Sequence, residues 1–178
     1  METLVQNTTF SGEDWALEEV EHVRYEDCAF HDVDWSEARL TGCVFSHCTF
    51  RKCSFFDTTL ADCKLTGTQF LDCGLRPLTV QGGDWAYVAL RGQNLTGAKL
   101  KGLRLREADL TGADLTRVDL RNADLAYARL KETRLDGADL RGADLDGIAL
   151  REVDLRGARI DLAQAGFFAA AHGAIVSP

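Results

Sequence analysis

Large apolar residues recur at every fifth position of the chain. Every residue whose number is a multiple of five, from Val5 to Ile160, is apolar, which makes 32 such positions in succession. An α-helix needs apolar residues about every 3.6 positions, and a β-strand needs them about every 2. The period of five therefore predicts neither element alone, and it indicates an internal repeat that determines the architecture.

A second register, of small residues, lies two positions before each large one. At positions 3, 8, 13 and onward to 158, 26 of 32 residues are Ala, Cys, Thr, Val or Gly. Each five-residue unit thus supplies one large and one small inward residue, as expected for a short extended piece followed by a turn. Such a unit buries its apolar side chain only by stacking on other units, so the pattern predicts a solenoid.

The units ADLTG, VDLRN, ADLAY and ADLDG resemble those of the pentapeptide-repeat proteins. In that family each unit forms one side of a right-handed quadrilateral β-helix, with four units in each turn. The resemblance implies an all-β solenoid over residues 1–160, with a separate C-terminal segment at residues 161–178. At a strand spacing of about 4.8 Å, about eight coils would make a rod of about 38 Å.

A period of twenty residues supports this fold. Positions 10, 30, 50 and 70 are Phe, and positions 90, 110, 130 and 150 are Leu, which predicts one interior side made of an aromatic stack and then a leucine ladder. The Trp residues also fall in the large register and are expected in the core. Pro77 removes one backbone donor, and the register continues through it, so a local kink without a domain boundary is expected.

The segment after Ile160 departs from the repeat and reads as a short α-helix. Asp161 stands at the N-cap with Gln164 in the capping-box position, and Gly173 can end the helix. Leu162, Phe167 and Phe168 make this segment more apolar than a solvated tail. They either cover the last coil or join two chains.

The net charge of −8 disfavours direct binding to nucleic acid, which requires a basic surface. The charge is uneven, because residues 1–38 contain eleven acidic residues against one arginine, whereas residues 51–106 contain nine basic residues against four acidic ones. No apolar run approaches the length of a membrane span. Free cysteines and the absence of a leader in METLVQNTTF predict a cytoplasmic protein.

The six cysteines all lie in the small register, at spacings that do not match a zinc site. They are expected to be buried free thiols that fill space. The four histidines lie in separate units and do not share a site with a nucleophile, and a regular solenoid offers no deep pocket. The sequence therefore predicts no catalytic residue, no metal site and no cofactor, and a protein that is not an enzyme.

Acidic residues recur in the C-terminal half, mostly directly before a core leucine. They are Asp109, Asp114, Asp119, Asp124, Asp136, Asp139, Asp144, Asp146 and Asp154. One interpretation is structural, because Asp before Leu suits a turn and its carboxylate can accept local amides. Nearby arginines, such as Arg121 and Arg141, can also neutralise part of the series. The other interpretation is an acidic rod that imitates DNA, although duplex DNA of that length would carry about 22 charges.

The C-terminal segment, CGLRPLTV at the midpoint and the uninterrupted repeat resemble, within the family, the mycobacterial fluoroquinolone-resistance members. That resemblance implies a homodimer joined at its C-terminal ends, through Leu162, Phe167 and Phe168. It further implies an acidic rod that binds DNA gyrase in place of DNA, modulates its supercoiling and ATPase activities, and protects it from fluoroquinolones. The aspartates above would form the gyrase-binding surface. The alternative is a pentapeptide-repeat scaffold for a different protein partner.

Overall fold

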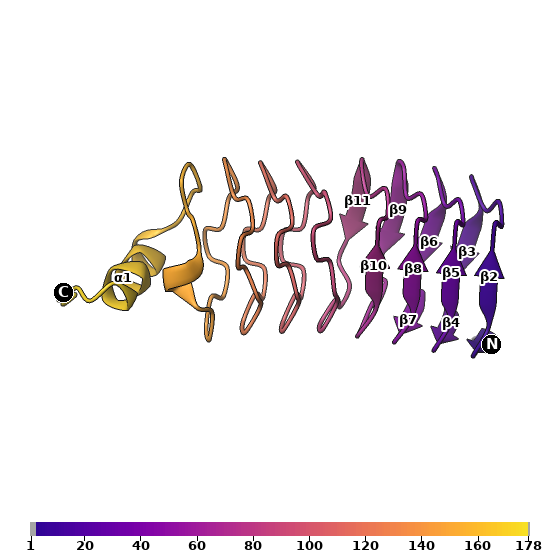
Figure 1. Cartoon of the computed structure of the whole chain (residues 1–178), viewed down its shortest axis with the longest axis horizontal. Helices are drawn as coiled ribbons and strands as arrows, with labels where there is room; N and C mark the ends of the chain where they lie inside the picture. The colour runs from indigo at the N-terminus through magenta and orange to yellow at the C-terminus, as the bar shows by residue number, and fades with distance from the viewer. Residues whose placement is uncertain (1–2, 178) are drawn as a thin grey trace.

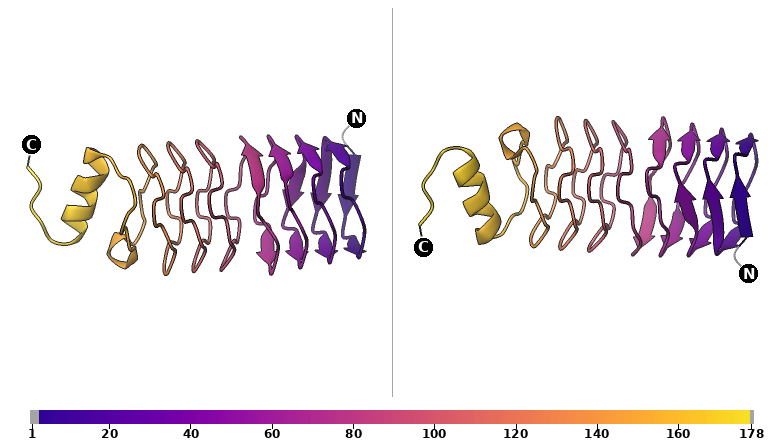
Figure 2. Two further views of the ribbon diagram at one scale, coloured as in Figure 1. Left: turned by 90° about the horizontal axis from the view of Figure 1, so that it is seen from above. Right: turned by 90° about the horizontal axis from the view of Figure 1, so that it is seen from below.

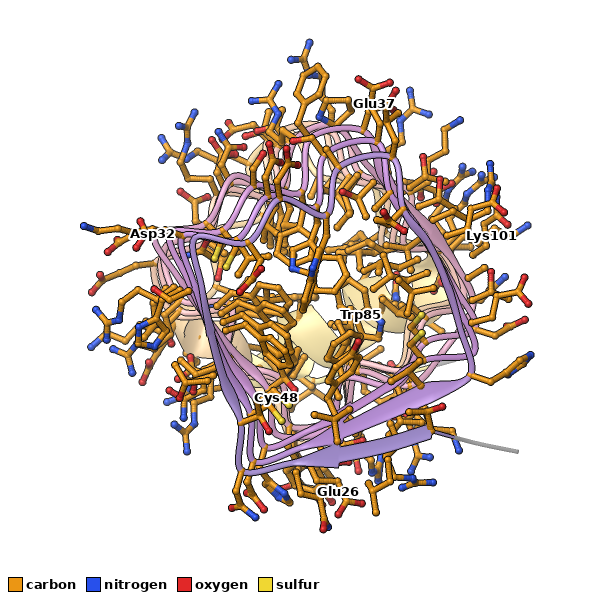
Figure 3. All side chains as sticks on the ribbon, turned by 90° about the vertical axis from the view of Figure 1, so that its right-hand side faces the viewer. Glu26, Asp32, Glu37, Cys48, Trp85 and Lys101 are labelled. Carbon is orange, nitrogen blue, oxygen red and sulfur yellow. The ribbon has the colours of Figure 1, made fainter. Side chains whose placement is uncertain are left out.

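The chain winds into a coil in which residues twenty positions apart lie beside one another. A computed structural model describes residues 3–177. Figures 1 and 2 show the coils stacked along one long axis, with a helix, α1 (Leu162–Ala171), at the C-terminal end. Viewed from the N-terminal end, the coil has four sides, with charged side chains outside and Trp85 and Cys48 inside (Figure 3).

Three of the four sides begin as parallel β-sheets. The first contains β1 (Thr3–Gln6), β4 (Val23–Glu26) and β7 (Val44–Ser46). The second contains β2 (Thr9–Ser11), β5 (Ala29–His31), β8 (Thr49–Arg51) and β10 (Gln69–Leu71). The third contains β3 (Glu19–Glu21), β6 (Arg39–Thr41), β9 (Thr58–Ala61) and β11 (Leu78–Gln81). Isolated bridges, such as Asp14 to Asp34, form the fourth side, and the predicted solenoid is confirmed.

Beyond β11 the solenoid continues without further strands. Isolated bridges keep the offset of twenty residues as far as the pair Asp139 and Arg159. From Val88 to Ala158 the amide of each small-register residue donates to the carbonyl of the core residue three positions earlier, as from Ala98 to Leu95 at 2.9 Å. Each side is therefore a turn with one bridging residue. Strands occupy the N-terminal coils, and coils without strands lead to α1.

The two inward registers form one continuous core. Phe10, Phe30, Phe50 and Phe70 stack along one side, with ring centroids 5.1, 4.6 and 5.1 Å apart. Leu90 and Leu110 continue that side and are completely buried. The predicted aromatic stack is thus confirmed, and the leucine ladder is confirmed as far as Leu130; Leu150 is only partly buried and lies in a short 3₁₀ helix.

The corners between sides need left-handed backbone. Residues whose numbers end in 2 or 7 have positive φ at most corners from Asn7 to Gly157. Glycine occupies many of these corners, such as Gly112 (φ 67°), and others carry larger residues, including Asp27 (φ 52°) and Tyr127 (φ 61°). Corner side chains lean along the rod, and the Tyr127 ring lies over the next corner residue on its edge, Gly147.

The segment around Pro77 is a local irregularity, as predicted. β11 still pairs with β9 in register, so the repeat is not displaced. On the neighbouring side, the bridges among the described residues include none between residues 74 and 94. There the Gln93 side chain accepts from the Cys73 amide at 3.3 Å.

None of the helices described within residues 3–177 has the length and apolar character needed to cross a membrane.

Near the end of the coil, the repeat pattern also gives way to a short 3₁₀ helix, η1 (Leu150–Glu152). The apolar periodicity runs through this segment without a change and gave no sign of it. The corner at Glu152 accordingly lacks the left-handed conformation of its equivalents.

Candidate interaction surfaces

Helix α1 closes the C-terminal end of the coil. Asp161 caps it, and Asp161 and Gln164 form the predicted capping box, with both hydrogen bonds at 3.0 Å. The Gln164 side chain is buried and also donates to the carbonyls of Leu140 and Ala143, at 2.7 and 2.9 Å. Phe168 packs against the core. These contacts replace those that a further coil would make.

The outer side of the same end is apolar and exposed. Leu162 is 92% exposed and Phe167 is 63% exposed, whereas Phe168 is partly buried and packs against the core of the coil. Ile175 and Val176, which the sequence interpretation did not include, add two further exposed apolar side chains. A hollow of about 270 Å³ lies beside Phe167, with Leu145, Ile148 and Leu150 among its lining residues. Of the three residues predicted to join two chains, Leu162 and Phe167 remain available.

The aspartates before core leucines stabilise their own turns. Their carboxylates accept the backbone amide two residues later in each case, for example from Thr116 to Asp114 at 3.0 Å and from Ala126 to Asp124 at 3.1 Å. The same bond is made by Asp109, Asp119, Asp139, Asp144 and Asp154. The structural interpretation of these residues is therefore supported at every position where Asp precedes Leu in the predicted surface.

Arginines neutralise most of the same carboxylates. Asp119 pairs with Arg121 at 2.7 Å, and Asp139 pairs with Arg141 at 2.7 Å. The remaining pairs of these carboxylates join Asp139 to Arg121 as well, Asp109 to Arg91 and Arg129, Asp114 to Arg134, Asp124 to Arg104 and Arg106, and Asp154 to Arg156. The ion pairs among the described residues include none at Asp136, Asp144 or Asp146. These three exposed carboxylates are the part of the predicted surface that forms no ion pair, although Asp136 still interacts electrostatically with Arg156.

The hydrogen bonds favour the charged carboxylates. The Arg121 guanidinium lowers the pKa of Asp119, and the Arg141 guanidinium holds the pKa of Asp139 at about 2. Burial works against ionisation of Asp109, but the Thr111 hydroxyl and amide, together with Arg91 and Arg129, outweigh it and lower the pKa of Asp109. Asp109, Asp119 and Asp139 are therefore ionised at neutral pH, and each lies in an ion pair with an arginine.

The N-terminal coils carry acidic residues of a different kind. Glu13, Asp14, Glu18, Glu19 and Glu21 are exposed and belong to none of the ion pairs described for residues 3–177. In this part of the chain the ion pair that the structure describes joins Arg24 to Glu26 at 3.5 Å. The predicted acidic surface omitted this end, although the excess of acidic residues over residues 1–38 already indicated it.

The cysteines are free thiols with a shared role in hydrogen bonding. Each donates from Sγ to the carbonyl of a core residue in the preceding coil, as from Cys48 to Tyr25 at 3.4 Å and from Cys53 to Phe30 at 3.3 Å. Thr58 makes the equivalent bond to Trp35 at 2.7 Å. Burial raises the pKa of Cys48 to about 12, so that thiol is protonated at neutral pH. Among the described residues no group of three or more His, Cys, Asp or Glu side chains could hold a metal ion.

A coil built from stacked five-residue sides defines a class of repeat protein. The chain belongs to the pentapeptide-repeat family: a model of the pentapeptide repeat region matches residues 34–115, and a model of eight pentapeptide repeats matches residues 119–157. Together these matches cover more than half of the chain. No curated protein matches its sequence.

Two solved forms of one protein share the fold at low sequence identity, and a third structure is less similar. A trypsin-treated form of QnrB1, a plasmid-mediated fluoroquinolone resistance protein, is 20% identical with a TM-score of 0.74, over 99% of this chain and 91% of that chain. A second trypsin-treated form is 18% identical with a TM-score of 0.68, over 98% and 100%. HetL from the cyanobacterium Nostoc is 20% identical with a TM-score of 0.43, over 89% and 90%. The two QnrB1 comparisons extend the likeness to the whole length of the solenoid.

Proposed function

We propose that the chain is a DNA-mimicking protein that binds DNA gyrase, modulates its supercoiling and ATPase activities and protects it from fluoroquinolones. The proposal describes a cytoplasmic binding protein and assigns no catalytic residue. The observation that carries it is the long rod of regular cross-section with its charged side chains outward (Figures 1 and 3). The likeness to QnrB1 over nearly the whole chain supports it.

The same proposal gives the C-terminal end the role of a dimer interface. Leu162 and Phe167 lie on the outer side of α1, and a second copy would cover both side chains and the hollow beside Phe167. Two rods joined end to end would present a surface of about twice 38 Å, which suits a long duplex-binding surface better than one rod.

The charge distribution favours a specific set of contacts. Asp136, Asp144 and Asp146 belong to none of the ion pairs among the described residues, and Asp144 and Asp146 line the hollow beside Phe167 at the end that would join the copies. We assign the strongest electrostatic contacts to these three, because the arginine-paired aspartates present little net charge. The extensive pairing also favours the second candidate function, a scaffold for a different protein partner, since a DNA mimic needs a dense free charge.

The experiment combines binding and activity. The purified chain is incubated with each gyrase subunit separately in a pull-down, and with the complete enzyme in supercoiling assays with and without a fluoroquinolone. Asp136→Asn/Asp144→Asn/Asp146→Asn should weaken gyrase binding more than the matched triple variant at the arginine-paired Asp114, Asp119 and Asp139. Binding that does not weaken as salt rises contradicts mimicry. Failure to bind either subunit favours the scaffold.

A further inference from the structure

The two ends of the rod are finished differently. Helix α1 covers the C-terminal end, whereas no element of the described chain covers the N-terminal end (Figures 2 and 3). Val5, Phe10, Trp15 and Val20 in the first coil are only partly buried and lie at the edge of the core, whereas Phe30, Trp35 and Leu40 one coil further are completely buried. The first coil therefore leaves one face of its apolar interior uncovered.

The first coil also presents an unpaired backbone edge. β1, β2 and β3 each lie at the end of their sheet. In the second coil the amides of Ala29, Asp34 and Arg39 donate to the carbonyls of Thr8, Glu13 and Glu18 in the first coil. The equivalent amides of the first coil, at positions 9, 14 and 19, have no preceding coil in the described chain to receive them. Such an edge is a template for another strand.

Charge selects the kind of strand that fits. On β3, Glu19 and Glu21 point outward on either side of the inward Val20, and the neighbouring β6 places Arg39 opposite Glu19 and Leu40 opposite Val20. A strand on the open side of β3 would face the same alternation of outward glutamates and inward valine. Two copies meeting at this end would bring their acidic residues together, and like charges across an interface oppose association.

We propose that the N-terminal edge at β3 is a docking site for an extended segment of a partner protein in which basic and apolar residues alternate. The segment adds a parallel strand to β3, its backbone carbonyl accepts from the Glu19 amide, and its apolar side chain packs on Val20 and Trp15. Its basic side chains lie against Glu19 and Glu21. This site does not depend on gyrase being the partner.

The test uses a fluorescently labelled peptide in which lysine alternates with valine. Anisotropy should show that it binds the full chain, and hydrogen–deuterium exchange should show slower exchange in residues 3–21 when it is bound. A glutamate–valine peptide should not bind. A lysine–valine peptide with alternate N-methylated amides, which has the same charge but cannot complete a strand ladder, should lose most of the binding.

Protein variants locate the site. Glu19→Gln/Glu21→Gln should weaken peptide binding by about fivefold, since two exposed ion pairs are lost. The matched pair Glu132→Gln/Glu152→Gln, which removes two exposed glutamates elsewhere, should leave it unchanged; circular dichroism checks that both variants fold. Equal binding of the N-methylated peptide, or unchanged exchange in residues 3–21, would overturn the proposal. Association of two chains through this end, seen as dimers that Glu19→Gln/Glu21→Gln strengthens, would overturn it in favour of a second copy.

Discussion

The Gln164 side-chain amide donates to the Leu140 carbonyl at 2.7 Å and so attaches α1 to the last coils. The same nitrogen donates to Ala143, and the amide oxygen accepts from the Asp161 backbone. Gln164→Glu should lower the free energy of unfolding by about 2–5 kcal/mol, because two buried carbonyls lose their donor and face a carboxylate. Denaturant titration measures the change. The exposed Gln69→Glu is the control and should cost under about 0.5 kcal/mol; equal costs would mean that the cap does not depend on this contact.

The Tyr127 ring restricts which residues fit at position 147, the next corner along the same edge of the coil. A Cβ added to Gly147 would lie 2.3 Å from Cδ1 of Tyr127, at a φ of 68°. Gly147→Ala should therefore destabilise the chain by more than the roughly 1–2 kcal/mol that left-handed backbone alone costs an alanine. Gly112→Ala is a matched control, since Gly112 has a φ of 67° and nothing within 4 Å of an added Cβ.

The pair of residues can be tested together. Tyr127→Ala combined with Gly147→Ala should recover the excess cost, leaving an effect close to that of Gly112→Ala in thermal unfolding. If Gly147→Ala and Gly112→Ala are equally unstable, the ring is not the constraint.

The aromatic stack predicts a large contrast between neighbours in sequence. Phe50 is 1% exposed between Phe30 and Phe70, with ring centroids at 4.6 and 5.1 Å. Phe50→Ala should cost about 3–5 kcal/mol through a buried cavity. Arg51→Ala, on the outward side of the same strand, should cost under about 0.5 kcal/mol. Similar unfolding midpoints for the two variants would be incompatible with the observed register.

The fold could be predicted from the sequence because every inward position obeys one period. Once residues twenty apart are known to stack, the positions of Phe50, Leu90 and the corner glycines follow directly. Interactions that depend on rotation or reach could not be predicted in the same way. Phe167 and Phe168 are both apolar neighbours on one short helix, and only its packing on the coil decides that Phe168 turns inward while Phe167 is exposed.

The charge state of the predicted acidic surface also needed the structure. The spacing along the chain suggests local pairs such as Asp119 with Arg121, and this ion pair is present in the structure. The pair Asp114 with Arg134 joins residues in adjacent coils, and its formation depends on how a long side chain lies along the surface. The repeat pattern also does not predict the state of two buried indole nitrogens. Those of Trp35 and Trp85 have no hydrogen-bond partner in the described chain.

Acid should remove a contribution of Asp139 within a defined pH range. Its carboxyl has a pKa of about 2 in the folded chain, below the ordinary value of 3.8, chiefly because Arg141 donates to it. A lowered folded pKa stabilises the fold above the unfolded pKa, and this contribution is lost as the pH falls through the folded pKa. Asp139→Asn should thus lower the melting temperature at pH 7, and the difference from the unmodified chain should shrink between about pH 4 and pH 2.

Asp144→Asn is the control for this titration. Asp144 accepts a backbone amide in the same way, from Asp146 at 3.0 Å, and belongs to none of the ion pairs described. An Asp139→Asn difference that stays constant from pH 7 to pH 2 would show that the arginine contact contributes nothing to stability.

The last prediction joins assembly to function. Leu162 and Phe167 are 92% and 63% exposed on the outer side of α1, so a second copy can bury both without disturbing the cap. Their burial in two chains would contribute several kcal/mol, at about 1.5–3 kcal/mol for each large apolar side chain. Leu162→Asp/Phe167→Asp should give a folded monomer in sedimentation velocity and a much weaker effect on gyrase supercoiling.

The control Gln69→Asp/Gln81→Asp adds the same charge at exposed positions far from α1 and should keep both the dimer and the activity. Because Phe168 packs against the core, Phe168→Ala should instead lower the unfolding temperature. A monomeric Leu162→Asp/Phe167→Asp variant with undiminished effect on gyrase would show that one rod is sufficient, and that joining two copies plays no part in binding.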